Sequence, residues 1–279
     1  MAARIEIASE AGACYGVERA LRMVEDAAKT STVPVHTLGP LIHNPRVVDD
    51  LAAKGVTVVA SPEDSAGDTL LLRTHGVTPE EERRARELCH DVLDATCPFV
   101  KKVHLAASRL YREGYQVVVV GEAGHPEVEA TLPHAPGAVV VGDVSKVEEL
   151  PFCKKIGVVV QTTQSRSNLQ HVVSALLDRA EEVRVVNTIC DATSGHQGAC
   201  AELAARTDVM IVIGGRISAN TKRLAEIAAE LCPRTYHIEG ADELDPSWLA
   251  GAGLIGITAG ASTPASQIDA VRKAIEAAI

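Results

Sequence analysis

Three of the seven cysteines in this 279-residue chain, Cys14, Cys97 and Cys190, share one sequence setting. Each follows an apolar run typical of a strand and precedes a stretch typical of a helix. Thiolate is the metal-binding form of cysteine, and the dipole and free N–H groups at a helix N-terminus lower the thiol pKa. Three such thiolates favour either a zinc site completed by a histidine or an iron-sulfur cluster with one open coordination position.

The remaining four cysteines lack that setting. Cys89 and Cys232 fall near the ends of probable helices, Cys200 falls within one, and Cys153 follows Pro-Phe in a connecting segment. Buried cysteine behaves as a small hydrophobic residue, so these four are predicted to be packing residues. An odd number of cysteines without a secretion signal also argues against a disulfide framework.

Polar side chains follow most of the apolar runs. They are His43, Asn44, His75, His125, Glu127, Gln161, Thr162, Thr163, Ser218, Asn220 and Ser262. Ligands of parallel sheets bind beyond the carboxyl ends of the strands, and neutral donors at helix N-termini satisfy phosphate oxygens without Lys or Arg. A single Ser or Asn at such a place is more often a helix cap, and a single His more often a structural residue. The number of equivalent positions favours a phosphate or diphosphate site.

Glu127 lies two residues after His125, at the start of a probable helix. A carboxylate there stabilises the helix dipole even without a catalytic role. The alternative is a proton donor, because only Asp94 and Asp191, which flank cysteines, provide other carboxylates in these strand-end motifs. Glu127 is therefore the candidate general acid.

Short β-branched runs alternate with helical patterns along the chain, which predicts an α/β fold of βαβ units with parallel sheets. One helix is expected over residues 169–182. The three cysteines are separated by 83 and 93 positions, and DATCP resembles TICDAT. We therefore predict three similar small α/β domains over residues 1–97, 98–189 and 190–279, with residues 1–13 packing with the third.

Composition and charge argue against several classes of protein. Hydrophobic residues make up 46% of the chain and aromatics 3%, so the core must consist of Ala, Val, Leu and Ile, as in helix-covered parallel sheets. A formal net charge of -10 without a Lys/Arg stripe argues against nucleic acid. The N-terminus carries no targeting pattern and no apolar run reaches membrane-spanning length, so a cytoplasmic protein without a membrane partner is expected.

Nine segments occur in the order GACYGVERA, LIHN, THGV, DATCPFV, AGHPEVE, QTTQS, NTIC, ISANTKRLAE and TAGASTP. Together they resemble the motifs of the LytB/IspH family of 4-hydroxy-3-methylbut-2-enyl diphosphate reductases, over nearly the whole chain. Each motif alone is a weak signal. Nine in the right order, carrying all three cysteines and three histidines, form a specific one.

The resemblance implies three α/β lobes with pseudo-threefold symmetry around one central 4Fe-4S cluster per chain, bound by Cys14, Cys97 and Cys190 with the fourth iron free. It implies reductive dehydroxylation of an allylic diphosphate to isopentenyl and dimethylallyl diphosphate, the last step of the methylerythritol phosphate route to isoprenoids. Glu127 would deliver a proton. The implied diphosphate and substrate contacts are His43, His75, His125, Gln161, Thr162, Thr163, Ser218, Ala219, Asn220 and Ser262. Electrons would come from an external ferredoxin or flavodoxin. No nicotinamide or flavin fingerprint is present, because no GxGxxG opens a helix after a strand.

The chain departs from the family pattern at three positions. Ala13 stands where the family usually has an aromatic residue, Ala219 where it has a second serine, and His196 where it has an arginine. The alternatives are a specialised paralogue acting on a related diphosphate, an iron-sulfur hydro-lyase that needs no electrons, a cluster-based sensor and a structural zinc protein.

Overall fold

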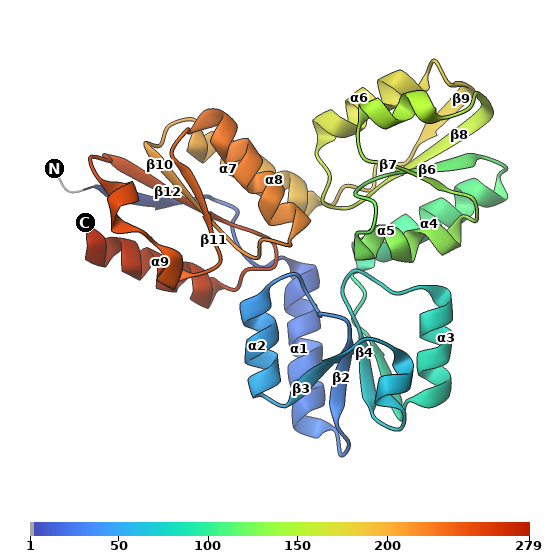
Figure 1. The fold of residues 1–279 in the computed structure, drawn as a ribbon, viewed down its shortest axis with the longest axis horizontal. Helices are drawn as coiled ribbons and strands as arrows, with labels where there is room; N and C mark the ends of the chain where they lie inside the picture. Colours follow the sequence, from blue (N-terminus) through green and yellow to red (C-terminus); the bar gives the residue numbers. More distant parts are fainter. Residues whose placement is uncertain (1–2) are drawn as a thin grey trace. The chain divides into compact units, whose positions relative to one another are not determined.

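The described residues, 3–279 of a computed structural model, form three parallel sheets of four strands each. The chain divides into two compact units, here called the larger and the smaller unit. The larger unit contains residues 18–42 and 49–190, and the smaller unit contains residues up to 17, 43–48 and 191–279. Helices accompany every sheet (Figure 1), so the predicted α/β class with parallel sheets is confirmed.

One sheet of the larger unit has the strand order β3-β2-β4-β5. The strands are β2 (Val35–Leu38), β3 (Val56–Val59), β4 (Thr69–Leu72) and β5 (Asp91–Asp94), and the helices before and between them are α1 (Tyr15–Thr30), α2 (Pro45–Ala53) and α3 (Pro79–Leu88). Leu38, Leu70 and Leu72 are almost completely buried in its core. Helix α3 begins at a capping box in which Thr78 accepts from the Glu81 N–H at 3.1 Å and the Glu81 carboxylate accepts from the Thr78 N–H.

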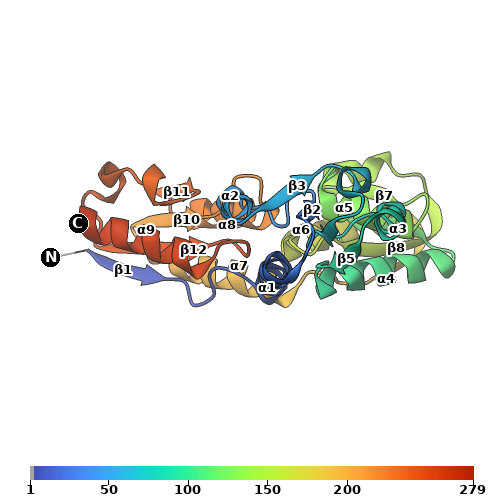
Figure 2. The ribbon, with the colours of Figure 1, turned by 90° about the horizontal axis from the view of Figure 1, so that it is seen from below.

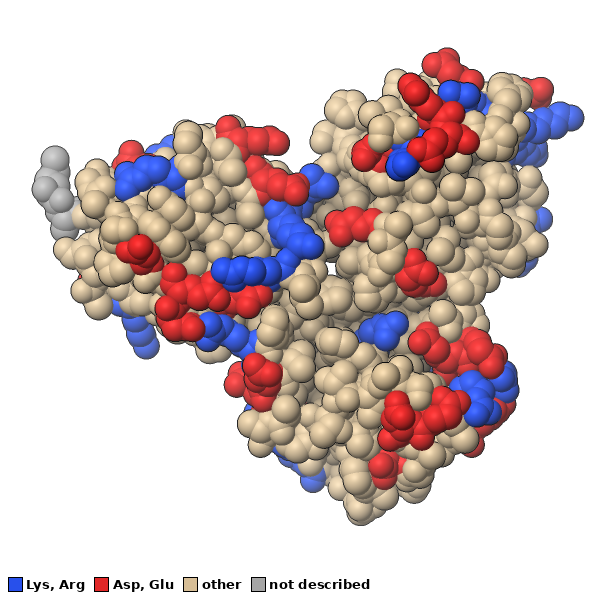
Figure 3. Space-filling model, in the orientation of Figure 1, with Lys and Arg blue, Asp and Glu red and all other residues tan. Residues whose placement is uncertain are grey.

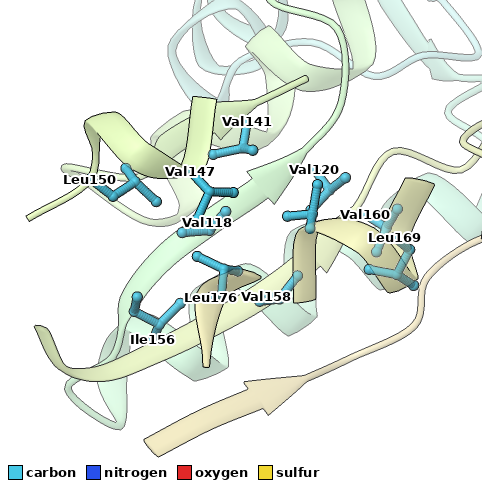
Figure 4. Close-up of a cluster of buried hydrophobic side chains, with 11 residues drawn as sticks. Val118, Val120, Val141, Val147, Leu150, Ile156, Val158, Val160, Leu169 and Leu176 are labelled. Atoms are coloured by element: carbon cyan, nitrogen blue, oxygen red, sulfur yellow. The ribbon is translucent and has the colours of Figure 1, made fainter. Parts of the chain in front are cut away.

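The other sheet of the larger unit has the order β7-β6-β8-β9. The elements are α4 (Pro98–Arg112), β6 (Gln116–Val120), α5 (Pro126–Thr131), β7 (Val139–Val141), β8 (Cys153–Val160), α6 (Arg166–Leu176) and β9 (Ala180–Val185). Figure 1 shows α6 on one face of this sheet and α4 with α5 on the other. Figure 4 shows valines of β6 and β8 packed with Leu169 and Leu176 of α6. Both faces are covered, which explains the continuous valine runs of these strands.

The sheet of the smaller unit has the order β1-β12-β10-β11. The elements are β1 (Arg4–Ile7), α7 (Asp191–Ala204), β10 (Val209–Ile213), α8 (Ala219–Leu231), β11 (Thr235–Ile238), β12 (Leu254–Ala259) and α9 (Ala265–Ala278). Strand β1 pairs in parallel with β12, with Arg4 opposite Leu254, so the N-terminal strand joins a sheet made otherwise from the C-terminal part of the chain (Figure 2).

The helix predicted over residues 169–182 is too long. Helix α6 ends at Leu176, and a turn in which the Arg179 N–H donates to the Leu176 carbonyl at 2.9 Å leads into β9. Residues 180–182 pair with β8 instead, Ala180 lying opposite Cys153. The sequence AEEVRV is compatible with both a strand and a helix. Pairing with β8 at the edge of the sheet makes it a strand.

Charged side chains of both signs are interspersed over the face shown in Figure 3. Many of them form ion pairs within one helix, such as Arg83 of α3, which contacts both Glu80 and Glu87. Exposed pairs of this kind contribute at most about 1 kcal/mol each. Stability must therefore come chiefly from the buried aliphatic clusters.

We expect Gly256→Ala to destabilise the smaller unit. A Cβ atom at Gly256 in β12 would press on the Met210 sulfur and approach Thr207 Cγ2 to 2.9 Å and Leu203 Cγ to 3.1 Å. Met210 and Leu203 are almost fully buried and have little room to move. Overpacking should lower the free energy of unfolding by roughly 1–3 kcal/mol, measured by urea denaturation.

The matched control is Gly198→Ala. Gly198 is exposed in α7, and no atom lies within 4 Å of its Cβ position. Alanine is favoured over glycine in a helix by about 1 kcal/mol, so this variant should raise the urea midpoint. A midpoint that is also raised in Gly256→Ala would contradict the close packing around β12.

Candidate active site

Cys14, Cys97 and Cys190 occupy equivalent places in the structure. Cys14 directly precedes α1, Cys97 is the N-cap of α4, and Cys190 directly precedes α7. Each backbone N–H donates to a carbonyl in the loop after the neighbouring strand. The acceptors are Ala261 after β12 at 3.1 Å, Thr74 after β4 at 2.9 Å and Thr162 after β8 at 3.2 Å. The three side chains are neither fully buried nor fully exposed.

This placement suits all three cysteines to binding a metal. Free N–H groups and the positive end of the helix dipole stabilise negative charge at a helix N-terminus. The backbone hydrogen bond holds each Cα in place, so that the sulfur is presented from a fixed position. The residues therefore have the chemistry and the support expected of metal ligands.

Arg19 supports the loop that ends at Cys97. Its guanidinium donates to the Asp94 carbonyl at 3.1 Å and to the Thr96 carbonyl at 3.4 Å. The Asp94 carboxylate accepts from the Thr96 N–H at 2.9 Å and contacts Lys101. Burial opposes charge on Asp94, but the hydrogen bonds from Lys101 and Thr96 outweigh it and lower the pKa of this carboxyl. The sequence prediction missed Arg19, whose only signal is its place one turn into the helix after Cys14.

Glu127 is a buried carboxyl held by one partner residue. It is 2% exposed, its Oε1 accepts from the Thr162 N–H at 2.6 Å, and its Oε2 accepts from the Thr162 hydroxyl at 2.7 Å. Burial raises the pKa of Glu127 to about 7, although both hydrogen bonds from Thr162 favour the charged form. A carboxyl with this pKa holds a proton in a large fraction of molecules at neutral pH, as a general acid must.

His125 and His75 lie close to Glu127 in the fold. His125 is the N-cap of α5, and its Nδ1 accepts from the Glu127 N–H at 3.1 Å. A neutral His125 therefore carries its proton on Nε2. The rings of His75 and His125 meet edge to face with centroids 5.6 Å apart. Three predicted site residues are thus brought together within the larger unit.

Gln161, Thr162 and Thr163 form the loop after β8. The Gln161 amide is already engaged, because its Oε1 accepts from the Glu122 N–H at 2.8 Å and its Nε2 donates to the Thr163 hydroxyl at 3.0 Å. Gln161 therefore orients Thr163 and closes the loop. Thr162 donates to Glu127. Thr163 is the least buried of the three residues, and its hydroxyl proton remains available for a ligand.

In the smaller unit, Ser218, Ala219 and Asn220 form the start of α8. Ser218 is the N-cap, and its hydroxyl accepts from the Thr221 N–H at 3.3 Å. Asn220 is 3% exposed, and its amide nitrogen and oxygen have no hydrogen-bond partner among residues 3–279. A buried amide without a partner costs about 1–3 kcal/mol, so Asn220 points to a ligand that supplies one.

His43 and Ser262 are brought together in the smaller unit. The Ser262 hydroxyl donates to the His43 carbonyl at 3.3 Å, and Asn44 Nδ2 donates to the Ser262 carbonyl at 2.9 Å. Gly215 lies against the same segment, where a Cβ atom would be 2.5 Å from the His43 carbonyl oxygen. Glycine is required there, since only it lets the loop before Ser218 approach His43 so closely.

The predicted site residues fall into two groups. The larger unit carries His75, Cys97, His125, Glu127, Gln161, Thr162, Thr163 and Cys190, and the smaller unit carries Cys14, His43, Ser218, Ala219, Asn220 and Ser262. Within the described part of either unit, no three His, Cys, Asp or Glu side chains are grouped as ligands of a single metal ion.

The other four cysteines pack against hydrophobic clusters, as predicted. Cys200 and Cys232 are buried, and Cys89 and Cys153 lie at the margins of two other clusters. Burial raises the pKa of Cys200 to about 11. Cys200 therefore has the inert character of a core thiol.

His196 lies in the second turn of α7. It is 6% exposed, and burial lowers its pKa below the ordinary value. The side chain is therefore neutral at pH 7, whereas the arginine usual in the resembled family would be charged.

The helices in the part of the chain that the structure describes are all too short or too polar to cross a membrane.

Comparisons with known proteins agree with the sequence motifs. The model of the LytB protein family matches residues 5–276. The 4-hydroxy-3-methylbut-2-enyl diphosphate reductase of Geobacter sulfurreducens is 50% identical over 273 residues, which cover 98% of this chain and 96% of the relative. The enzyme of the same name from Aquifex aeolicus is 46% identical over 276 residues, with coverage of 98% and 96%.

Two solved structures are also similar. One is an (E)-4-hydroxy-3-methyl-but-2-enyl diphosphate reductase, the terminal enzyme of the non-mevalonate pathway, which is 46% identical with a TM-score of 0.74 over 98% of this chain and 99% of that one. The other is the E-1-hydroxy-2-methyl-but-2-enyl-4-diphosphate reductase of Plasmodium falciparum, with 27% identity and a TM-score of 0.91 over 99% and 88%. The chain therefore belongs to the LytB protein family, as its motifs predicted.

Proposed function

We propose that this protein reduces 4-hydroxy-3-methylbut-2-enyl diphosphate to isopentenyl and dimethylallyl diphosphate, the last step of the methylerythritol phosphate route. The observation that carries the proposal is identity of 46–50% with named reductases over 98% of the chain. The repeated setting of Cys14, Cys97 and Cys190 and the buried acid Glu127 supply the chemistry that this reaction needs.

The three cysteines would hold one 4Fe-4S cluster. Their chemistry fits, because all three thiols lie at helix N-termini and sulfur is the usual ligand of such clusters, and three ligands leave one iron open. When bound, the cluster supplies single electrons and a Lewis-acidic iron for the hydroxyl oxygen. Three α/β domains over residues 1–97, 98–189 and 190–279 would be arranged with pseudo-threefold symmetry about the cluster, with Cys14 and Cys97 belonging to the first and Cys190 opening the third.

The diphosphate would be held by neutral donors. These are His43, His75, His125, Thr163, Ser218, Asn220 and Ser262, with the backbone N–H of Ala219. The unpartnered amide of Asn220 supports this assignment, since a phosphate oxygen would accept from its nitrogen. Fixing the diphosphate also orients the hydroxyl end of the substrate. The free energy of diphosphate binding then lowers the entropic part of the reaction barrier.

Glu127 would deliver the proton with which the substrate hydroxyl leaves as water. Thr162 donates to both carboxyl oxygens and so fixes the orientation of the Glu127 carboxyl group. Electrons would come from an external one-electron carrier, a ferredoxin or flavodoxin, and the reaction would take place in the cytoplasm.

An anaerobic assay with dithionite-reduced methyl viologen and the allylic diphosphate tests the proposed function. Formation of the two diphosphate products only in the presence of reductant is the expected result. Loss of water from the substrate without reductant would instead indicate a hydro-lyase. No conversion by protein with a full iron complement would favour a sensor.

We expect Cys97→Ser to abolish both the cluster and turnover, since each of the three cysteines supplies one of only three protein ligands. Cys89→Ser is the matched control, because Cys89 ends α3 in the same unit and packs against its core. Iron per chain after anaerobic reconstitution is the measurement. A full cluster in Cys97→Ser would refute the ligand assignment.

Arg19→Met should weaken cluster retention without unfolding the protein. The variant loses two hydrogen bonds to the loop before Cys97, each contributing about 1 kcal/mol. Iron content and the electron paramagnetic resonance spectrum of the reduced protein report the change. Arg22→Met, in the same helix, changes an exposed arginine that pairs with Glu18 and should match the unsubstituted protein. Identical spectra for both variants would remove Arg19 from the support of the loop before Cys97.

Glu127→Gln should lower turnover at least roughly a hundredfold, the ordinary contribution of general acid catalysis, with little change in substrate affinity. In the unsubstituted protein, turnover should fall as pH rises through about 7, because Glu127 then loses its proton. Glu129→Gln is the control, since Glu129 is an exposed carboxylate in the same helix. Near-normal turnover of Glu127→Gln with an intact cluster would return Glu127 to a structural role.

A further inference from the structure

Helix α4 is basic in a chain that is acidic as a whole. Its 15 residues include Lys101, Lys102, Arg109 and Arg112 and contain no Asp or Glu, whereas the formal net charge of the chain is -10. Helix α3, by contrast, balances three arginines with four glutamates. The basic character of α4 is therefore local and distinct.

The helix separates its buried and exposed residues cleanly. Val100, Val103, Ala107 and Leu110 are buried against the sheet, and Figure 2 shows α4 below β8 at the lower border of this part of the molecule. The exposed side carries Lys102, Leu105, Arg109 and Arg112, spaced three or four residues apart and so aligned along one side of the helix. We call these four residues the α4 stripe.

Leu105 is the apolar centre of the α4 stripe. At 70% exposure it is the most exposed large hydrophobic side chain among the described residues. It separates two hollows, one of about 340 Å³ that Lys101 and His104 help to line and one of about 210 Å³ that Arg109 and Arg184 help to line. A single exposed leucine means little, but this one lies between a hollow of mixed charge, lined by Lys101, Glu82 and Asp94, and a hollow lined by Arg109 and Arg184. An apolar centre with a charged surround has the form of an interface centre with a polar rim.

Acidic groups near α4 only partly cancel its charge. Asp94 pairs with Lys101, and Glu113 is shared by Arg109 and Arg184. Glu82 at the edge of the larger hollow pairs with Arg86 of its own helix.

Two cations of the stripe stay outside these pairs. Lys102 and Arg112 form no ion pair within residues 3–279, and Lys102 lies over the Phe99 ring at 4.7 Å. The surface keeps a net positive charge that is available to a partner.

We propose that the α4 stripe is the docking surface for an acidic one-electron carrier protein. The proposal rests on the proposed function, which requires such a carrier. Cys97, a proposed cluster ligand, is the N-cap of the same helix, and Leu105 lies about 12 Å further along its axis. A carrier seated on the stripe would therefore bring its redox centre to the end of the helix where electrons are needed.

Charge complementarity selects this partner. An acidic carrier is repelled by the chain as a whole and attracted by α4, so the stripe steers the encounter and restricts its orientation. Each encounter oxidises one carrier by one electron. Two encounters and two protons convert the substrate R–OH to R–H and water, which balances the reaction.

The test compares two electron donors in steady-state turnover. A plant-type 2Fe-2S ferredoxin kept reduced by an excess of its own reductase is the protein donor, and reduced methyl viologen is the small donor. The variants are Leu105→Glu and the double variant Lys102→Glu with Arg112→Glu. With ferredoxin, the KM for the donor should rise roughly tenfold or more and its dependence on salt should weaken, whereas turnover with viologen should not change.

The controls match the variants in exposure and in charge. Leu177→Glu changes a leucine that is 62% exposed at the end of α6, on the opposite face of the same sheet. Lys273→Glu changes an exposed lysine of α9. Both should keep the KM for ferredoxin of the unsubstituted protein.

An unchanged KM for ferredoxin in both stripe variants would overturn the proposal, as would an equal loss of turnover with both donors. Titration calorimetry of ferredoxin against the variants separates this inference from the proposed function. If the unsubstituted protein fails to turn over with viologen, the proposed function fails. Binding of ferredoxin that is lost in the stripe variants and kept in the controls would still support the surface, and equal binding by all of them would refute it.

Discussion

The backbone hydrogen bonds of the three cysteines are the constraint on which the rest of the site depends. Each joins a cysteine to the loop after the neighbouring parallel strand, and in each case the acceptor residue is next to a proposed substrate contact. Thr74 precedes His75, Thr162 precedes Thr163, and Ala261 precedes Ser262. Because parallel strands end at the same edge of a sheet, one hydrogen bond per sheet positions a proposed cluster ligand beside a proposed substrate contact.

The proposed diphosphate site contains few cations. Helix N-termini and neutral side chains are the proposed donors, and burial lowers the pKa of His196, which replaces the arginine usual in the family pattern. Cations are used instead for support, as Arg19 is, or stay on the outer surface of α4. The distribution leaves the site able to bind an anion without holding a permanent excess of positive charge.

The features that the sequence predicted well are those encoded in local pattern. Valine runs specify doubly covered parallel strands, and a polar residue after each run specifies the carboxyl edge of a sheet. The end of α6 was missed, because AEEVRV fits a helix until pairing with β8 is considered. Arg19 was missed because its partners are carbonyls about 75 residues away. The engagement of Gln161 was missed for the same reason, since its partner in the loop after β6 is distant in sequence.

Burial of Glu127 has opposite effects on the stability of the fold and on the ability of this carboxyl to hold a proton. Burial raises the pKa of this carboxyl from 4.5 to about 7 in the folded protein. The unfolded chain releases this proton near pH 4.5 and the folded protein holds it until about pH 7, so the free energy of unfolding falls over that interval as pH rises. A shift of this size corresponds to about 3 kcal/mol lost at neutral pH and above. Thr162 offsets part of that cost through its two hydrogen bonds. A third donor would offset more, but it would also favour the carboxylate and remove the proton that Glu127 is proposed to deliver.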